Sequence, residues 1–464
     1  MRTLSIKYLL LAGLSALAGS LLHAGERPNL IVIMTDDQGY ADVGFNGCTD
    51  IPTPHIDTIA EQGVRFSNGY VSYPVCGPSR AGFITGRYQQ RFGFERNPQY
   101  RTNDPNMGLP RSEETIAEVL RKAGYTSGIV GKWHLGAHPD LHPLSRGFDF
   151  FHGHLGGGHN YFPELLTIRE SEDATNEPQS YQTWILRNHE PVEPSKYLTD
   201  DFSDAAVEFI GMNKDNPFFL FLSYNAPHTP MQATEEYLAR FPDIKDQKRR
   251  TYAAMVSAVD DGVGRVLAKL EELGLDENTL VFFLSDNGGS PKNASVNTPL
   301  RGHKSDVWEG GHRVPFALRW SGRVEAGSVY DRPVSSLDIL GTIAGLTGVA
   351  IAPERPLDGV NLIPFLEAEE QGDPHHALYL RKWDQQRYVV RKGDHKLVIP
   401  TKQGKPQLFN LAEDIGEKKN IIRSEKEIAR ELEGLRLQWD SELMEPRFLG
   451  LIHTDAWKKR QKKN

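Results

Sequence analysis

Apolar runs of strand length alternate with helix-like patterns along most of the chain. Runs typical of buried strands occupy residues 29–34, 125–130, 218–223 and 279–285. Between them, segments such as 252–274 place apolar residues on one face at helical spacing and end at a glycine. Alternating strands and helices predict an α/β fold with a mostly parallel central sheet flanked by helices.

Short polar clusters follow these four strands directly. In chain order they are Asp36 and Asp37, Lys132 and His134, His228, and Asp286 and Asn287. Because ligands in open parallel sheets bind beyond the carboxyl ends of the strands, we expect these side chains to meet at one edge. One such cluster alone would be typical of a turn, but four clusters on four strands indicate a site.

The chain after about residue 370 follows a different pattern. Strand-like runs within residues 377–400 are separated by polar turns, and residues 426–443 have the pattern of an amphipathic helix. Since 464 residues exceed one core of ordinary size, we predict a main catalytic domain over residues 25–370. Residues 371–464 are predicted to form a smaller C-terminal subdomain, an antiparallel sheet with a helix.

The first residues have the features of a signal peptide. Arg2 and Lys7 precede an uncharged, largely apolar run at Tyr8–Leu22, and Ala24 offers a cleavage position. The run is short for a bilayer, which needs about 20 residues, so residues 1–24 are predicted to be removed rather than kept as an anchor. We therefore expect an exported protein, periplasmic or extracellular, with no stable membrane anchor.

Charge and cysteine content narrow the functional class. The formal net charge of −8 disfavours nucleic acid as a partner, because phosphate binding needs a basic face. The basic tail at residues 458–464 is typical of a solvated terminus. Two cysteines, Cys48 and Cys76, cannot staple a chain of this size, and the sequence does not decide whether they pair.

The polar clusters indicate a metal and an anionic substrate. Oxygen ligands suit Ca²⁺ or Mg²⁺, and four residues supply them: Asp36, Asp37, Asp286 and Asn287. The alternative is that the adjacent acids only cap a turn. Positive charge and proton transfer, which a bound sulfate or phosphate requires, would come from Lys132, His134, His228 and Lys304. Taken singly, each of these is more typical of a solvated lysine or a structural histidine.

Cys76 lies in the segment YPVCGPSRAGFITGR, residues 73–87. Pro78 is well placed as an early helix residue and Gly86 as the stop, so Cys76 is predicted at a helix N-terminus. Backbone N–H groups there favour an anion, which would lower the pKa of the thiol and suit a nucleophile.

This segment resembles the signature of the type I, formylglycine-dependent sulfatases of the alkaline phosphatase superfamily. C-x-P-S-R followed by T-G-R is the core of the match. It extends through RPNLIVIMTDDQGYADVG, GKWHLG, NAPHTP, SDNGG and GHKSDVWEGGHRVP, and LFNLAEDIGEKKNI near the C-terminus is also similar. Within the family, the chain resembles secreted bacterial arylsulfatases and carbohydrate sulfatases of the N-acetylgalactosamine-6-sulfatase type.

The resemblance implies that Cys76 is converted to Cα-formylglycine by a formylglycine-generating or sulfatase-maturating enzyme. It also implies that the hydrated aldehyde completes a metal site, usually for Ca²⁺, with Asp36, Asp37, Asp286 and Asn287. By the same resemblance, Arg80 would hold the finished residue in place, and Lys132 and Lys304 would bind the sulfate. His134 would contact the hydrated aldehyde, and His228 would contact the leaving oxygen. Cys48 is then left as an unpaired thiol.

The substrate indicated is a sulfate monoester on a sulfated saccharide or polysaccharide. Arg301 and His303, which lie close to Lys304, are candidates for contacts to a second anionic group. Residues 153–162 are rich in glycine, histidine and aromatics, as a sugar-contacting loop or a structural turn would be. The alternatives are a phosphate ester or phosphonate hydrolase of the same fold, or a secreted glycan-binding protein that has lost catalysis.

Overall fold

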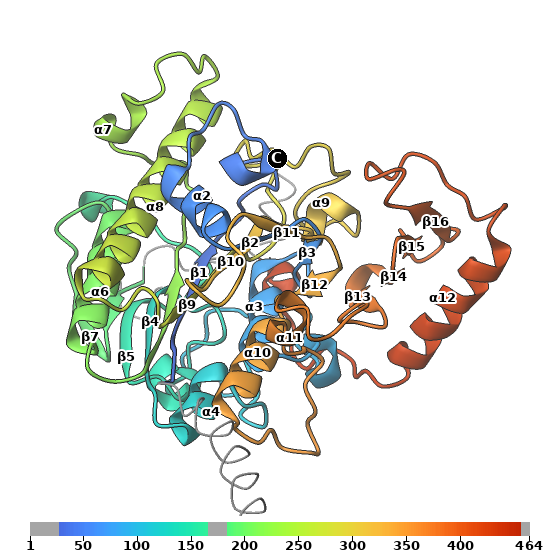
Figure 1. Cartoon of the computed structure of the whole chain (residues 1–464), viewed down its shortest axis with the longest axis horizontal. Coiled ribbons are helices and arrows are strands. Elements are labelled where there is room, and N and C mark those ends of the chain that lie inside the picture. The colour runs from blue at the N-terminus through green and yellow to red at the C-terminus, as the bar shows by residue number, and fades with distance from the viewer. Residues whose placement is uncertain (1–26, 166–182, 456–464) are drawn as a thin grey trace, which may run out of the picture.

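A ten-stranded sheet runs through the larger part of the protein (Figure 1). The computed structural model describes residues 27–165 and 183–455, so the predicted signal peptide and the basic tail lie outside the described residues. In order across the sheet the strands are β11 (Ser328–Tyr330), β2 (Val64–Phe66), β10 (Phe316–Arg319), β9 (Thr279–Ser285), β1 (Asn29–Thr35), β8 (Phe218–Ser223), β4 (Thr126–Lys132), β5 (Phe150–His154), β6 (Ile185–Arg187) and β7 (Glu190–Val192).

The central strands β9, β1, β8, β4 and β5 all pair in parallel. β10 joins β9 in the antiparallel sense on one side, and β6 and β7 extend the other side in the same way. The four strands expected from the sequence are confirmed as β1, β4, β8 and β9. The mostly parallel sheet predicted from them is confirmed as well.

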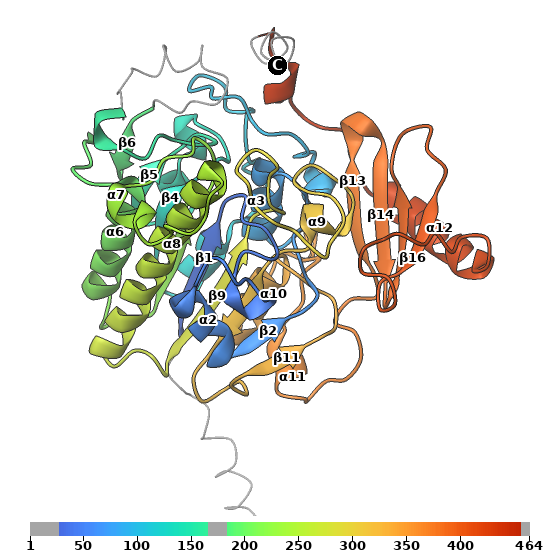
Figure 2. The ribbon, with the colours of Figure 1, turned by 90° about the horizontal axis from the view of Figure 1, so that it is seen from above.

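Helices cover both faces of this sheet, as predicted, and Figure 2 shows α6 and α8 side by side on one of them. That face packs against α2 (Pro54–Glu61), α6 (Leu198–Met212) and α8 (Gln247–Glu272). The other face packs against α3 (Cys76–Thr85), α4 (Ile116–Lys122) and α10 (Asp338–Thr347). Along β1, Ile31 and Ile33 face the first layer while Leu30 and Val32 face the second. Burial on both sides explains why the strand sequences are continuously apolar.

A separate antiparallel sheet lies beside the main one. Its strands, in order, are β13 (Leu378–Lys382), β14 (Arg387–Lys392), β15 (His395–Ile399) and β16 (Gln407–Asn410). One face packs through Val390 and Leu397 against α12 (Lys426–Asp440). The other face packs through Val389 and Val398 against Val307 of the main part. The predicted small C-terminal sheet with a helix is therefore confirmed.

The remaining α-helices and strands of residues 27–165 and 183–455 are short. They are α7 (Glu235–Leu238), α9 (Glu309–His312), α11 (Ile363–Leu366) and the strand pair β3 (Gly69–Tyr70) and β12 (Val334–Ser335). The domain boundary predicted near residue 370 lies between α11 and β13. Across residues 27–165 and 183–455, no helix has both the length and the apolar character that crossing a bilayer requires.

Candidate active site

The carboxyl ends of β1, β4, β8 and β9 lie together at one edge of the sheet. The strand register sets this alignment: Thr35 lies opposite Ser285, and Ser223 is paired with both Met34 and Gly131. The residues that follow the strands therefore emerge side by side, as the sequence predicts.

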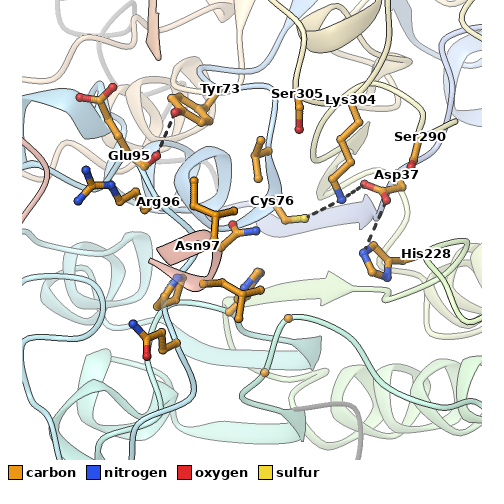
Figure 3. Close-up of a pocket in the computed structure, with 18 of the residues that line it drawn as sticks. Asp37, Tyr73, Cys76, Glu95, Arg96, Asn97, His228, Ser290, Lys304 and Ser305 are labelled. Atoms are coloured by element: carbon orange, nitrogen blue, oxygen red, sulfur yellow. Dashed lines mark hydrogen bonds and ion pairs between the residues drawn. The ribbon is translucent and has the colours of Figure 1, made fainter. Parts of the chain in front are cut away.

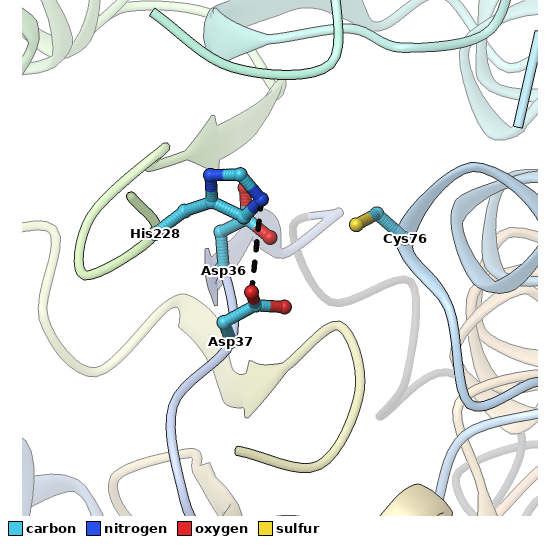
Figure 4. Close-up of side chains that lie close together, drawn as sticks. All are labelled: Asp36, Asp37, Cys76 and His228. Carbon is cyan, nitrogen blue, oxygen red and sulfur yellow. Dashed lines mark ion pairs between the residues drawn. The ribbon is translucent and has the colours of Figure 1, made fainter. Parts of the chain in front are cut away.

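Acidic side chains that follow β1 and β9 form one buried cluster. The backbone N–H of Asp37 donates to Asp286 Oδ1 at 3.3 Å, and Asn287 Nδ2 donates to Asp37 Oδ1 at 2.7 Å. The backbone at Asp37 has a φ of 64°, a strained conformation for a non-glycine residue that recurs at functional sites. Four side chains each offer one ligand atom within 4.8 Å of the others (Figure 4): Asp36, Asp37, Cys76 and His228.

The donor set of this cluster fits a hard divalent cation. Asp36 Oδ1 and Asn287 Oδ1 are buried and have no hydrogen-bond partner among the described residues. A buried oxygen without a partner costs about 1–3 kcal/mol, and an oxygen-seeking cation removes that cost. Ca²⁺ or Mg²⁺ therefore suits these residues better than a thiolate-seeking metal does.

Each carboxylate of the cluster faces a buried or half-buried cation. Lys132 Nζ lies 2.5 Å from Asp36 Oδ2, and Lys304 Nζ lies 2.6 Å from Asp37 Oδ1. Arg80 Nε donates to Asp286 Oδ2 at 2.9 Å.

These six side chains, three acids and three bases, balance in charge. A divalent cation added to a balanced cluster leaves a net positive charge, which an anionic ester compensates. A bound divalent cation would therefore favour an anion at this site.

Cys76 begins α3, so the predicted helix N-terminus is confirmed. Lys304 Nζ donates to Cys76 Sγ at 3.2 Å (Figure 3), and the backbone N–H of Gly77 is bound by Asn97 Oδ1 at 2.9 Å. The expected lowering of the thiol pKa is wrong. Burial raises the pKa of Cys76 to about 12, although Lys132 and Lys304 oppose the change. The thiol itself is therefore protonated near neutral pH and is a poor nucleophile.

The two cysteines are both free thiols, so they do not pair. Cys48 is half-buried and hydrogen-bonds Asp50. Its predicted unpaired state is confirmed.

A cleft of about 490 Å³ opens above Cys76 (Figure 3). His134, His228 and Lys304 line its floor with Cys76. Its outer part is lined by residues 95–100 and by Lys382, Asp384 and Gln385. Clefts of this volume bury most of the surface of a small-molecule ligand.

Residues 28–349 of the chain match the family model described as sulfatase. The chain belongs to the sulfatase family. N-acetylgalactosamine-6-sulfatase of Mus musculus is 35% identical to it over 374 residues, which cover 77% of this chain and 69% of the mouse protein. Members of the family hydrolyse sulfuric esters, and this sulfatase is a sulfuric ester hydrolase.

Solved structures show the same fold. The crystal structure of Ps i-CgsB in complex with k-i-k-neocarrahexaose is 38% identical to this sulfatase, with a TM-score of 0.86 over 94% of this chain and 97% of that chain. The PsFucS1 sulfatase from Pseudoalteromonas sp. is 26% identical, with a TM-score of 0.77 over 94% of each chain.

The two histidines predicted from the sequence both reach the floor of the sulfatase cleft. His228 Nε2 lies 3.6 Å from Asp37 Oδ2, and its Nδ1 contacts the carbonyl of Thr229 at 2.7 Å. Burial lowers the pKa of His228 to about 3, although Asp37 opposes the change. Burial, with Lys132 adding to it, also holds the pKa of His134 well below its usual value. Both imidazoles are therefore neutral near pH 7.

The glycine-rich segment 153–162 supports His134 from one side. Its first residues form the end of β5, and the carbonyl of Leu155 accepts from the backbone N–H of His134 at 3.2 Å. A Cβ atom at Gly157 would lie 2.8 Å from His134 Nε2, so only glycine allows this approach. The segment thus has a structural role at the site, and Leu155 and Gly157 also line the cleft.

The structure separates the two candidates for a second anion contact. His303 lines the cleft, but Arg301 points elsewhere. Arg301 donates to the carbonyl of Glu417 at 2.8 Å and stacks over the ring of Trp308 at 3.5 Å.

Sequence reasoning missed two residues that serve the sulfatase site. Ser223, the last residue of β8, accepts from Arg80 at 2.6 Å and so helps to orient the guanidinium that holds Asp286. Lys382, the last residue of β13, lines the outer cleft. No local signal marks either one, although both stand at strand ends.

Proposed function

We propose that this sulfatase hydrolyses sulfate monoesters on a sulfated saccharide, with formylglycine made from Cys76 and a bound divalent metal. The observation that carries the proposal is the position of Cys76. Its Sγ stands 3.2 Å from Lys304 Nζ, beside the carboxylates of Asp36 and Asp37 and at the floor of a cleft of about 490 Å³. The similarity to a sulfatase-fold structure bound to k-i-k-neocarrahexaose supports a sulfated oligosaccharide of that kind.

Asp36, Asp37, Asp286 and Asn287 would hold the metal, with Ca²⁺ as the first choice and Mg²⁺ as the second. Such an ion stabilises negative charge on sulfuryl oxygens. Formylglycine supplies a geminal diol, of which one hydroxyl is the nucleophile and the other allows sulfate to be released. In the unmodified chain, Cys76 Sγ stands in for one of these hydroxyl oxygens.

The lysines provide the fixed positive charge of the site. Lys132, beside Asp36, and Lys304, beside Asp37, would bind the sulfuryl oxygens of the ester. Arg80 is fully buried, pairs with Asp286 and stands one helical turn after Cys76 in α3, so it would orient the nucleophile rather than the substrate.

Proton transfer falls to Lys304 and the histidines. Asp37 raises the pKa of Lys304 although burial opposes its charge, so Lys304 carries a proton close to the leaving oxygen. His228 Nδ1 donates to a carbonyl, so its neutral Nε2 would accept a hydrogen bond from the departing alcohol. His134 is the base that removes a proton at position 76.

The test compares 4-nitrophenyl sulfate, 4-nitrophenyl phosphate and sulfated oligosaccharides as substrates of the protein purified from a host with a maturation enzyme. We expect sulfate release from the sulfated compounds and a loss of turnover in Cys76→Ala. Peptide mass spectrometry should find formylglycine at position 76. Preferred turnover of the phosphate, or full activity in Cys76→Ala, would refute the proposal.

We also propose that residues 1–24 are removed on export to the periplasm or beyond, and that residues 25–370 and 371–464 are distinct domains. N-terminal sequencing of the native protein tests the first part, with Gly25 as the expected first residue. Limited proteolysis tests the second, with cleavage expected between α11 and β13.

A further inference from the structure

The C-terminal sheet forms the outer wall of the active-site cleft. β13 ends at Lys382, and the cleft is lined there by Lys382, Asp384 and Gln385. Across the floor stand Cys76 and Lys304. The small sheet therefore contributes charged side chains to the site as well as supporting it.

Lys382 is a buried ammonium without a carboxylate partner within ion-pair distance in the described structure. Lys382 is 6% exposed, and its Nζ donates to the carbonyl of Ser305. Burial lowers the pKa of Lys382 to about 8, and Arg387 adds to the lowering while Asp306 and Asp384 oppose it.

Two other cations of the cleft, Lys304 and Arg96, have carboxylate partners. Lys304 pairs with Asp37 at 2.6 Å, and Arg96 pairs with Asp384 at 2.6 Å. Because Arg96 occupies Asp384, this acid is not free to neutralise Lys382. A buried charge is costly unless it is paired, so an anion that enters the cleft meets an uncompensated ammonium on this wall.

We propose that Lys382 binds a second anionic group of the saccharide, a sulfate or a carboxylate beyond the ester that is cleaved. This inference rests on the proposed function, because it requires a saccharide in the cleft. Ser305 directly follows Lys304 in the chain, so the two lysines act on neighbouring parts of one ligand. Lys382 takes the role that the sequence suggested for Arg301.

The experiment uses pairs of oligosaccharides of equal length that differ by one sulfate, and pairs that differ by one carboxylate. 4-Nitrophenyl sulfate, which carries only the ester that is cleaved, is the reference substrate. The variants are Lys382→Met and Lys382→Arg, with Lys392→Met as the matched control. Lys392 belongs to the same sheet, but its ammonium contacts Glu431 of α12, away from the cleft.

The wild type should prefer the more highly charged member of a pair. Lys382→Met should lower kcat/KM for that member about ten-fold or more, mainly through KM, because a charge-assisted hydrogen bond is lost. Its kcat/KM for 4-nitrophenyl sulfate and for the less charged member should change less than about two-fold. Lys382→Arg should keep most of the preference, and Lys392→Met all of it. The sulfate and carboxylate pairs show which of the two groups the wall binds.

Two results would overturn the inference. If the wild type turns over both members of every pair equally, Lys382 does not contact a second anion, and this result needs no variant. If Lys382→Met loses activity equally on both members of a pair and on 4-nitrophenyl sulfate, the lysine only holds Ser305 and the neighbouring Lys304. Absence of wild-type activity on any sulfate ester would instead refute the proposed function.

Discussion

Replacing Lys396 by methionine removes the positive charge from a buried ion cluster that joins the C-terminal sheet to the active-site loop. Lys396 Nζ lies 2.7 Å from Glu309 Oε1 and 2.9 Å from Glu417 Oε1, and all three side chains are fully buried. Glu309 directly follows the loop 300–308, which carries Lys304. The cluster therefore fixes that loop against β15.

The expected loss of unfolding free energy depends on the partners that Glu309 and Glu417 keep after the substitution. Glu309 retains Arg313 at 3.3 Å, whereas Glu417 retains the hydrogen bond from the backbone N–H of Glu309 at 2.7 Å. Breaking a buried ion pair by removing one partner costs about 3–5 kcal/mol. Burial already raises the pKa of Glu417, so protonation relieves part of the loss. We therefore expect a decrease near the lower end, about 3 kcal/mol in the free energy of unfolding.

A second substitution tests the physical reason. In Lys396→Met with Glu417→Gln, the neutral amide still accepts from the backbone N–H of Glu309, and no uncompensated charge remains. The double variant should regain about 1–2 kcal/mol over the single one. Lys392→Met, at a solvent-exposed pair with Glu431, should leave the unfolding midpoint close to that of the wild type.

Guanidinium unfolding followed by tryptophan fluorescence measures these differences, since Trp308 packs against Phe409 in the same interface. The reasoning fails if Lys396→Met unfolds at the same midpoint as Lys392→Met. It also fails if the double variant is no more stable than Lys396→Met alone.

Three further predictions concern pH, metal and backbone. Burial opposes the positive charge of His375, but Asp338, 2.8 Å from Nε2, raises the pKa of this histidine. The pair therefore stabilises the fold fully below pH 6.5, and this stabilisation is lost as pH rises through the raised pKa. His375→Gln should remove the resulting fall in unfolding free energy above pH 6.5. Adding Ca²⁺ to chelator-treated protein should raise Tm, and Asn287→Ala should need more Ca²⁺ for the same rise; an unchanged Tm in the wild type would contradict the metal site. Gly157→Ala should lower kcat with little change in Tm, because the new methyl meets His134; unchanged kcat would show that the contact does not matter.

The core of the fold and the floor of the site were predictable from sequence because both follow from strand order. A continuous apolar run such as Asn29–Thr35 has few interpretations other than a strand buried on two faces. Once the strands are parallel, the residues after them share an edge whatever the loops do. Asp36 and Asp286 therefore meet although 250 positions separate them in the sequence.

Properties that depend on distant packing were not predictable. The pKa of Cys76 reflects burial of a helix start, which outweighs the favourable N–H groups that the sequence suggests. Arg301 is close to Lys304 in sequence, but the chain turns at Gly302, which lies between them, and at Ser305, which follows Lys304. Both residues have a positive φ, of 80° and 74°. Lys382 enters the site from a sheet whose position no local pattern specifies.

The burial of α3 has a consequence for how the enzyme is made. All ten residues of the helix are buried, from Cys76 to Thr85. If Cys76 is converted as proposed, a modifying enzyme would have to bind residues 76–80 as an exposed peptide, which the completed sheet and its covering helices prevent. Oxidation of Cys76 would then compete in time with folding of the newly made chain. The relative rates of these two processes would set the fraction of active molecules, so slowing the folding should yield a more active preparation of the same protein.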